Sequence, residues 1–202
     1  ASPLDMAAAY GTLANGGVYI EPITFTTVTT SDDQILIQNT PEEHRVVSED
    51  VAYVMTDMMK AVVTQGTGGA ASFGDMPVAG KTGTTNKSLD AWFVGYTPYY
   101  VGATYLGDDA GRKDPNGNTI SRKGISGGSS SAAKLWSTIM NKIHKNLTKT
   151  EFKVPENIYF TKINLIDGGR SSYGSNAAFI KGTGPSRYSS QTIKQPSKTE
   201  ED

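Results

Sequence analysis

Lys81 and the threonines that follow it are the residues whose types and spacing best suit chemistry. They lie in the run AGKTGTTN, from Ala79 to Asn86. Such a run could cradle a phosphate, bind a peptide carboxylate, or form only a turn. A phosphate-binding loop has the form G-x-x-x-x-G-K-S/T and leads directly into a helix. Here five residues separate Gly74 from Gly80, one too many, and the chain continues into an aromatic segment, which disfavours the phosphate interpretation.

The carboxylate interpretation places the run on the edge strand of a sheet. Alternation would then project Lys81 and Gly83 to one face, and Thr82 and Thr84 to the other. Gly83 would let a substrate backbone approach, and exposed edge amides could pair with an extended peptide. Lys81 would supply a cationic donor, threonine hydroxyls could bind a terminal carboxylate, and a backbone N–H could face a developing oxyanion. The motif alone supports a solvated glycine-threonine turn equally well.

The segments around the run predict an α+β fold in which helices flank an antiparallel sheet. Serine caps and apolar residues at helical spacing predict three helices, in SPLDMAAAYGTLANGG, VSEDVAYVMTDMMKAVVTQGTGG and SSSAAKLWSTIMNKIHKNL. Alternating residues predict a hairpin that turns at Ser31, Asp32 and Asp33. Three strands are expected between Pro77 and Leu106, too closely spaced for helical crossovers, so we expect them to be antiparallel.

The pattern within each predicted helix indicates which face is buried. The first helix has a face of small residues, so we expect it to be buried. The second helix has an apolar stripe made of Val51, Val54, Met55, Met58 and Val62. The third has apolar residues on one side: Ala133, Trp136, Ile139, Met140 and Ile143.

The chain is expected to divide by composition. Residues 1–147 form the helix- and strand-rich part, residues 148–185 an extension, and residues 186–202 a tail that we expect to be disordered. No apolar run approaches the roughly 20 residues that a membrane-spanning helix needs. The chain opens without an initiator methionine, and we expect it to be a piece of a longer protein.

Composition excludes several classes of function. The chain has 19 basic and 20 acidic residues, so there is no electrostatic case for nucleic acid or an anionic membrane as a partner. Cysteine is absent, which excludes disulfides and cysteine metal sites. His44 and His144 are isolated and expected at the surface. The run DPNGNT from Asp114 lacks the bidentate acid of a calcium loop, so we expect a polar turn, no metal and no cofactor.

The run and its flanks together resemble the penicillin-binding transpeptidases. GKTGTTN followed by DAWFVGYTP resembles their third signature, the K-T-G strand and the strand after it. Other segments occur in the order of the bifunctional, class A members: SPLDMAAAYGTLANGGVYIEP, SEDVAYVMTDMMKAVVTQGTGGAA, SGGSSSAAKLWSTIM and AAFIKGTGPS. The resemblance covers roughly residues 1 to 185 and implies the C-terminal part of a penicillin-binding, serine β-lactamase-like transpeptidase domain.

The resemblance implies a role for each residue of the run. Lys81 matches the lysine that orients the hydroxyl network and the substrate carboxylate. Thr82 and Thr84 match hydroxyls that hold the terminal carboxylate of a D-Ala-D-Ala stem peptide or a β-lactam. The amide of Thr84 matches one half of the oxyanion hole, and Gly83 keeps the strand clear. Lys81 and Thr84 are thus the expected catalytic residues, and Thr82, Gly83, Thr84 and Thr85 the expected substrate-binding residues.

The implied reaction needs residues that this chain does not offer. Acyl transfer through a serine ester requires a serine with a lysine three residues on, and an S-x-N motif. Ser131 and Lys134 have that spacing, but they follow K-T-G rather than precede it, so we interpret them as a helix start and a surface lysine. In GSN, Ser175 adjoins Asn176, which is not S-x-N. We expect the segment alone to be inactive and to need the missing N-terminal part as a partner.

Several interpretations share the K-T-G motif. The class A-like flanks favour a peptidoglycan cross-linking enzyme at the extracytoplasmic face of the bacterial membrane, with its anchor outside this segment. A D,D-carboxypeptidase or serine β-lactamase would also carry the motif. A non-catalytic β-lactam sensor or scaffold with the same sheet is the alternative from another class.

Overall fold

The computed structural model describes residues 1–108 and 111–190. The chain divides into two compact units, Ala1–Lys153 and Val154–Asp202. The first unit extends past the predicted boundary at Thr148, since the ring of Phe152 packs edge-on against Tyr96 with ring centroids 5.6 Å apart. Of the predicted tail, residues 191–202 lie outside the described part, whereas Ser189 donates its backbone N–H to Arg170 O at 2.8 Å.

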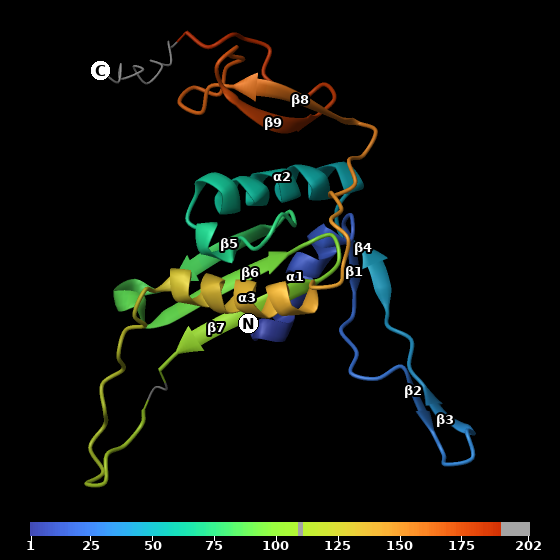
Figure 1. Ribbon diagram of the computed structural model, residues 1–202, viewed down its shortest axis with the longest axis vertical. Helices are drawn as coiled ribbons and strands as arrows, with labels where there is room; N and C mark the ends of the chain where they lie inside the picture. Colours follow the sequence, from blue (N-terminus) through green and yellow to red (C-terminus); the bar gives the residue numbers. More distant parts are fainter. Residues whose placement is uncertain (109–110, 191–202) are drawn as a thin grey trace. The chain divides into compact units, whose positions relative to one another are not determined.

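A three-stranded antiparallel sheet forms the centre of the first unit (Figure 1). Its strands are β5 (Ala79–Thr84), β6 (Asp90–Tyr96) and β7 (Val101–Gly107), in that order across the sheet. This confirms the prediction of three antiparallel strands. Within the described residues β5 pairs only with β6, so β5 is an edge strand.

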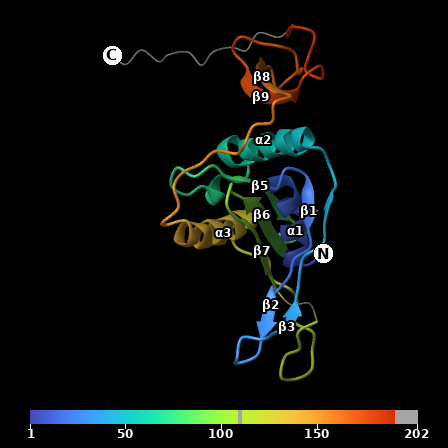
Figure 2. The same ribbon diagram turned by 90° about the vertical axis from the view of Figure 1, so that its right-hand side faces the viewer.

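Three helices surround the sheet (Figure 2). They are α1 (Pro3–Ala14), α2 (Glu49–Gln65) and α3 (Ser129–Ile143). Figure 2 shows α1 and α3 on opposite faces of the sheet and α2 beside β5. The predicted caps are confirmed: Ser2 forms a capping box with Asp5, and the Ser48 hydroxyl accepts from Val51 N at 3.2 Å.

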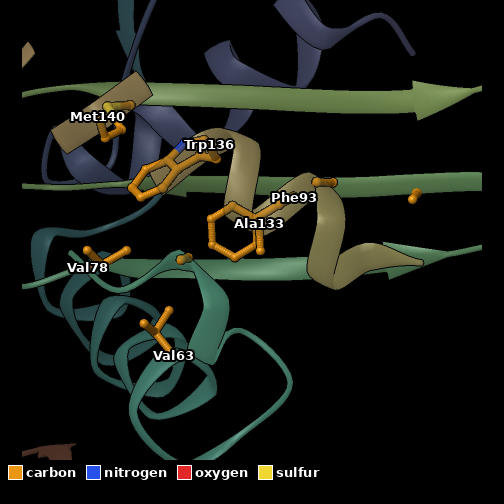
Figure 3. Close-up of a cluster of buried hydrophobic side chains, with 9 residues drawn as sticks. Val63, Val78, Phe93, Ala133, Trp136 and Met140 are labelled. Atoms are coloured by element: carbon orange, nitrogen blue, oxygen red, sulfur yellow. The ribbon is translucent and has the colours of Figure 1, made fainter. Parts of the chain in front are cut away.

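The core lies mainly between the sheet and α3, with Val63 of α2 at its edge (Figure 3). Phe93 of β6 meets Trp136 of α3 edge-on, with ring centroids 5.2 Å apart. Gly80, Gly95 and Gly102 lie opposite one another across the three strands. A methyl group on Gly80 or Gly95 would lie 2.6 Å from the Phe93 ring, and one on Gly102 would lie 2.8 Å from Met140 Cε. These glycines therefore leave the space that the large side chains fill.

The predicted buried faces of the helices are only partly right. In α1 Thr12 is buried, but Leu4 is 59% exposed, so the prediction of a buried first helix is wrong. Met58 of the α2 stripe is 59% exposed, and Ile139 of α3 is 47% exposed. Of the predicted α3 face, Ala133, Trp136 and Met140 are buried as expected. The other buried positions of the two helices were not predicted: Ala52, Tyr53, Thr56, Val63, Ala132 and Ser137.

The prediction of a surface position for His144 is also wrong, because its side chain is only 6% exposed. Its Nδ1 lies 2.7 Å from Met140 O, and its Nε2 lies 2.8 Å from Thr97 Oγ1. The carbonyl can only accept, so Nδ1 carries the proton and the Thr97 hydroxyl donates to Nε2. The rings of Tyr99 and Tyr100 also contact it. Hydrogen bonds to both nitrogens make burial of this imidazole tolerable.

The remaining elements form small pairs and turns. The predicted hairpin is present as β2 (Thr27–Thr29) and β3 (Ile35–Gln38), and its turn includes the expected residues 31–33. An outer pair, β1 (Val18–Ile20) with β4 (Glu43–Arg45), was not expected. The 3-10 helices η1 (Gly69–Ala71) and η2 (Asn86–Ser88) are short. In the second unit, β8 (Ile158–Ile163) pairs with β9 (Ser175–Ile180).

Candidate functional site

The run AGKTGTTN forms the edge strand β5 and the turn after it. Lys81 lies opposite Val94, and Gly83 lies opposite Trp92. Thr82 lies opposite Phe93, whose ring faces α3. Because opposite residues share a face, Lys81 and Gly83 project to the α1 side, and Thr82 and Thr84 to the α3 side. The predicted alternation is confirmed.

A pocket of about 410 Å³ opens where α1 approaches this edge. It is lined by Ala1, Met6, Tyr10, Lys81, Thr82, Gly83, Trp92 and Val94. The strand contributes the Lys81 cation, backbone at Thr82 and the unshielded backbone at Gly83, and β6 contributes an indole. This combination suits an anionic group on a ligand with an extended backbone. A larger pocket of about 610 Å³ between α1 and residues 19–22 and 46–47 contains none of the predicted site residues.

Three hydrogen bonds hold the polar groups of Lys81 and Thr82. Lys81 Nζ donates to the backbone oxygen of Thr82 at 2.9 Å. The Thr82 hydroxyl lies 2.7 Å from the hydroxyl of Thr67, just after α2. The ammonium and the hydroxyl are thus held within reach of one another, with Lys81 Nζ 3.4 Å from Thr82 Oγ1.

Gly83 leaves the strand open beside an aromatic wall. A methyl group on Gly83 would lie 3.3 Å from Trp92 Cβ. The indole of Trp92 in turn packs on Tyr105 of β7, with ring centroids 4.8 Å apart. Phe93 and Tyr96, on the same strand as Trp92, are core residues with 0% exposure.

Thr84 and Thr85 lie at the end of β5 and do not line the pocket. Thr84 is exposed. The Thr85 hydroxyl donates to Asp90 Oδ2 at 3.0 Å and accepts from Asp90 N at 2.9 Å. The structure therefore brings Lys81, Thr82 and Gly83 together and places Thr84 and Thr85 beyond them, with Thr85 already engaged by Asp90.

Residues distant in sequence complete the strand end. Tyr105 donates to Asp90 Oδ1 at 2.7 Å, and Arg122 Nη2 lies 2.5 Å from the same oxygen. The Arg122 guanidinium first, and then the Tyr105 hydroxyl, hold the pKa of the Asp90 carboxyl below its usual range. Sequence analysis missed these residues together with Thr67. Thr85 and Asp90 flank one turn in the sequence, which was the available signal for their contact. Nothing in the sequence pointed to Arg122.

The other candidate sites do not assemble. The Ser131 hydroxyl donates to Ser126 O at 2.6 Å, and Lys134 is exposed, so neither serves the other. The turn at Asp114 is held by its own Asn116 and Asn118. Within residues 1–108 and 111–190, no group of three or more histidine and acidic side chains could hold a metal ion. No helix in that part of the chain is long and apolar enough to cross a bilayer.

Residues 1–140 match the family described as the penicillin binding protein transpeptidase domain. Penicillin-binding protein 1A of Clostridium acetobutylicum is 39% identical over 185 residues, covering 91% of this chain and 20% of that protein. The chain spans about a fifth of the length of the curated relatives that it matches.

Solved structures share the fold. Penicillin-binding protein 1A from Haemophilus influenzae superimposes with a TM-score of 0.74 at 24% identity, over 94% of this chain and 33% of that one. The PonA1 protein of Mycobacterium tuberculosis in complex with penicillin V superimposes with a TM-score of 0.57 at 30% identity, over 75% of this chain and 40% of that one.

Proposed function

Because the chain belongs to the penicillin-binding protein transpeptidase family, we propose that it supplies one wall of the acyl-transfer site of a serine-type D,D-transpeptidase. A serine hydroxyl attacks the D-Ala-D-Ala peptide bond, D-alanine leaves with the serine proton, and an acyl ester remains. The amine of a neighbouring stem peptide then attacks the ester, forms the cross-link and restores the serine. A β-lactam would acylate the same serine.

The observation that carries this proposal is the edge strand β5, with Lys81, Thr82 and Gly83 together at one pocket. Every second residue of an edge strand turns its N–H and C=O away from the neighbouring strand. An extended stem peptide can pair with these groups. Its terminal carboxylate would meet the Lys81 ammonium and the hydroxyls of Thr82 and Thr84, and the Thr84 amide would donate to the oxyanion.

The nucleophile comes from a part of the protein outside this chain. The chain is about a fifth as long as its relatives, so the S-x-x-K and S-x-N residues would lie in the rest of the protein. The pocket beside α1 leaves room for them to approach Lys81. The natural substrate would be the peptidoglycan stem peptide, at the extracytoplasmic face of the bacterial membrane, with β-lactams as inhibitors.

Labelling of the full-length protein with fluorescent penicillin tests this function. We expect covalent labelling of the wild type and of Lys134→Ala, which removes an exposed lysine of α3. Lys81→Ala should slow labelling about a hundredfold, the usual loss for a group that stabilises developing charge. A folded wild-type protein that takes up no label would contradict the proposal.

The choice of acyl acceptor separates a transpeptidase from a carboxypeptidase. With a stem-peptide donor, we expect product that contains an added amine acceptor to exceed the hydrolysed product. Hydrolysis alone at saturating acceptor would instead indicate a D,D-carboxypeptidase.

A further inference from the structure

We propose that Asp90 is a positioning residue that fixes the Thr84–Thr85 end of β5 and so sets the affinity of the site for a substrate carboxylate. This inference rests on the proposed function. Asp90 does not line the pocket, so it would act through the threonines rather than on the substrate.

The first observation is the closure of the turn between β5 and β6. Thr85 N donates to Asp90 O at 3.0 Å. Asp90 N donates to the Thr85 hydroxyl at 2.9 Å, and that hydroxyl donates to Asp90 Oδ2 at 3.0 Å. Backbone and side chain of each residue thus contact the other, which ties the end of β5 to the start of β6.

The second observation is that the carboxylate itself is held from the opposite side. Its Oδ1 accepts from the Tyr105 hydroxyl at 2.7 Å and from Arg122 Nη2 at 2.5 Å. Asp90 Oδ2 therefore bonds to the turn, and Oδ1 bonds to β7 and to the loop beyond it. The Asp90 and Arg122 side chains are 21% and 26% exposed, so water competes only partly for these contacts.

The third observation is the anchoring of Arg122. Its Nη2 also donates to Leu89 O at 3.1 Å, and its Nε donates to Asp108 O at 2.7 Å. Ile125 N of the same loop donates to Ser88 O at 2.7 Å. The loop between β7 and α3 therefore holds the turn at several points.

The fourth observation is that the turn is strained. Lys87 and Ser88 have φ angles of 60° and 53°, in the left-handed region that side chains other than glycine rarely adopt. Such a conformation persists only where the surroundings determine it. The contacts among Thr85, Asp90, Tyr105 and Arg122 (the Asp90 cluster) hold the turn in this conformation next to Thr84.

The test compares two acyl donors on the full-length protein. Penicillin carries the carboxylate that the threonines would bind, whereas penicillin methyl ester does not. Asp90→Asn keeps the side-chain shape but replaces one carboxylate oxygen with an N–H2 group, which cannot accept a hydrogen bond. In place of Oδ1 that group would face the donors of Arg122 and Tyr105, and in place of Oδ2 it would face the Thr85 hydroxyl. We expect the second-order rate constant for acylation by penicillin to fall about tenfold or more, and that for the ester to change much less.

The control is Asp114→Asn. Asp114 also organises a turn in the loop after β7, through residues of that turn such as Asn116 and Asn118. Its substitution should leave both rate constants unchanged. Tyr105→Phe provides a milder second variant in case Asp90→Asn does not fold, and it should lower the penicillin rate more than the ester rate.

The outcomes are distinguishable. An equal fall for acid and ester, or no fall in either variant, would overturn the positioning role while leaving the proposed function intact. A wild-type protein that reacts with neither compound would overturn the proposed function, and this inference with it.

Discussion

The Thr82 hydroxyl is oriented by a residue outside β5. Thr67 lies at 2.7 Å from it, after the end of α2. Thr67→Val removes this partner with little change in shape, and we expect acylation of the full-length protein by penicillin to slow about threefold, the effect of one modest hydrogen bond.

Thr64→Val is the matched control, because Thr64 bonds only the Lys60 carbonyl within α2, at 3.1 Å. The Thr64→Val protein should be acylated by penicillin at the wild-type rate. Equal rates for all three proteins would show that Thr67 does not orient Thr82.

Tyr96 gives a prediction about pH. Burial raises its pKa to about 12, although the hydrogen bond with Thr56 acts in the opposite direction. Its ordinary pKa is about 10. Stability from the neutral phenol is therefore fully present below about pH 10 and is lost as pH rises through about 12.

Thermal unfolding of the full-length protein between these pH values measures the effect. The wild type should lose more stability than Tyr96→Phe as pH rises. Parallel losses would mean that Tyr96 is not buried as a neutral phenol.

At the scale of elements, the row of Gly80, Gly95 and Gly102 lets α3 approach the sheet. Gly102→Ala would place a methyl group 2.8 Å from Met140 Cε and 2.9 Å from Trp136 Nε1. We expect this overpacking to lower the free energy of unfolding by about 1–3 kcal/mol.

Denaturant unfolding of the full-length protein measures that loss. Gly69→Ala is the control, because a methyl group there would have its nearest neighbour at 3.8 Å and Gly69 is exposed. A Gly102→Ala protein as stable as this control would contradict the close packing of α3.

Local patterns predicted the elements better than their contacts. Serine caps located α1 and α2, and the short spacing of three apolar segments identified the antiparallel sheet. Periodicity selected Ala133, Trp136 and Met140 of α3 correctly but not the buried face of α2, because small residues such as Ala52 contribute little apolar signal. His144 was misassigned because burial depended on Thr97, far away in the sequence.

In the candidate site, too, the local pattern was predicted from the sequence and the long-range contacts were not. Alternation along β5 correctly separated Lys81 and Gly83 from Thr82 and Thr84. The pairing of Asp90 with Arg122 joins residues 32 positions apart through a long loop. No local pattern encodes such a contact, so only the folded chain shows it.

At the scale of the whole molecule, the proposed function gives this chain one wall of a site rather than a complete one. It is about a fifth as long as its relatives, and α1 exposes apolar residues such as Leu4. The single S-x-x-K in the described helices, at Ser131, has its hydroxyl engaged by Ser126 O. Function at this scale depends on residues that the rest of the protein would contribute.

Locating the penicilloyl group by mass spectrometry of the digested full-length protein tests the central claim most directly. We predict one adduct, on a serine outside residues 1–202, that forms in Ser131→Ala as readily as in the wild type and far more slowly in Lys81→Ala. An adduct on Ser131, or an adduct whose rate of formation does not depend on Lys81, would contradict the assignment of β5 as one wall of an acyl-transfer site.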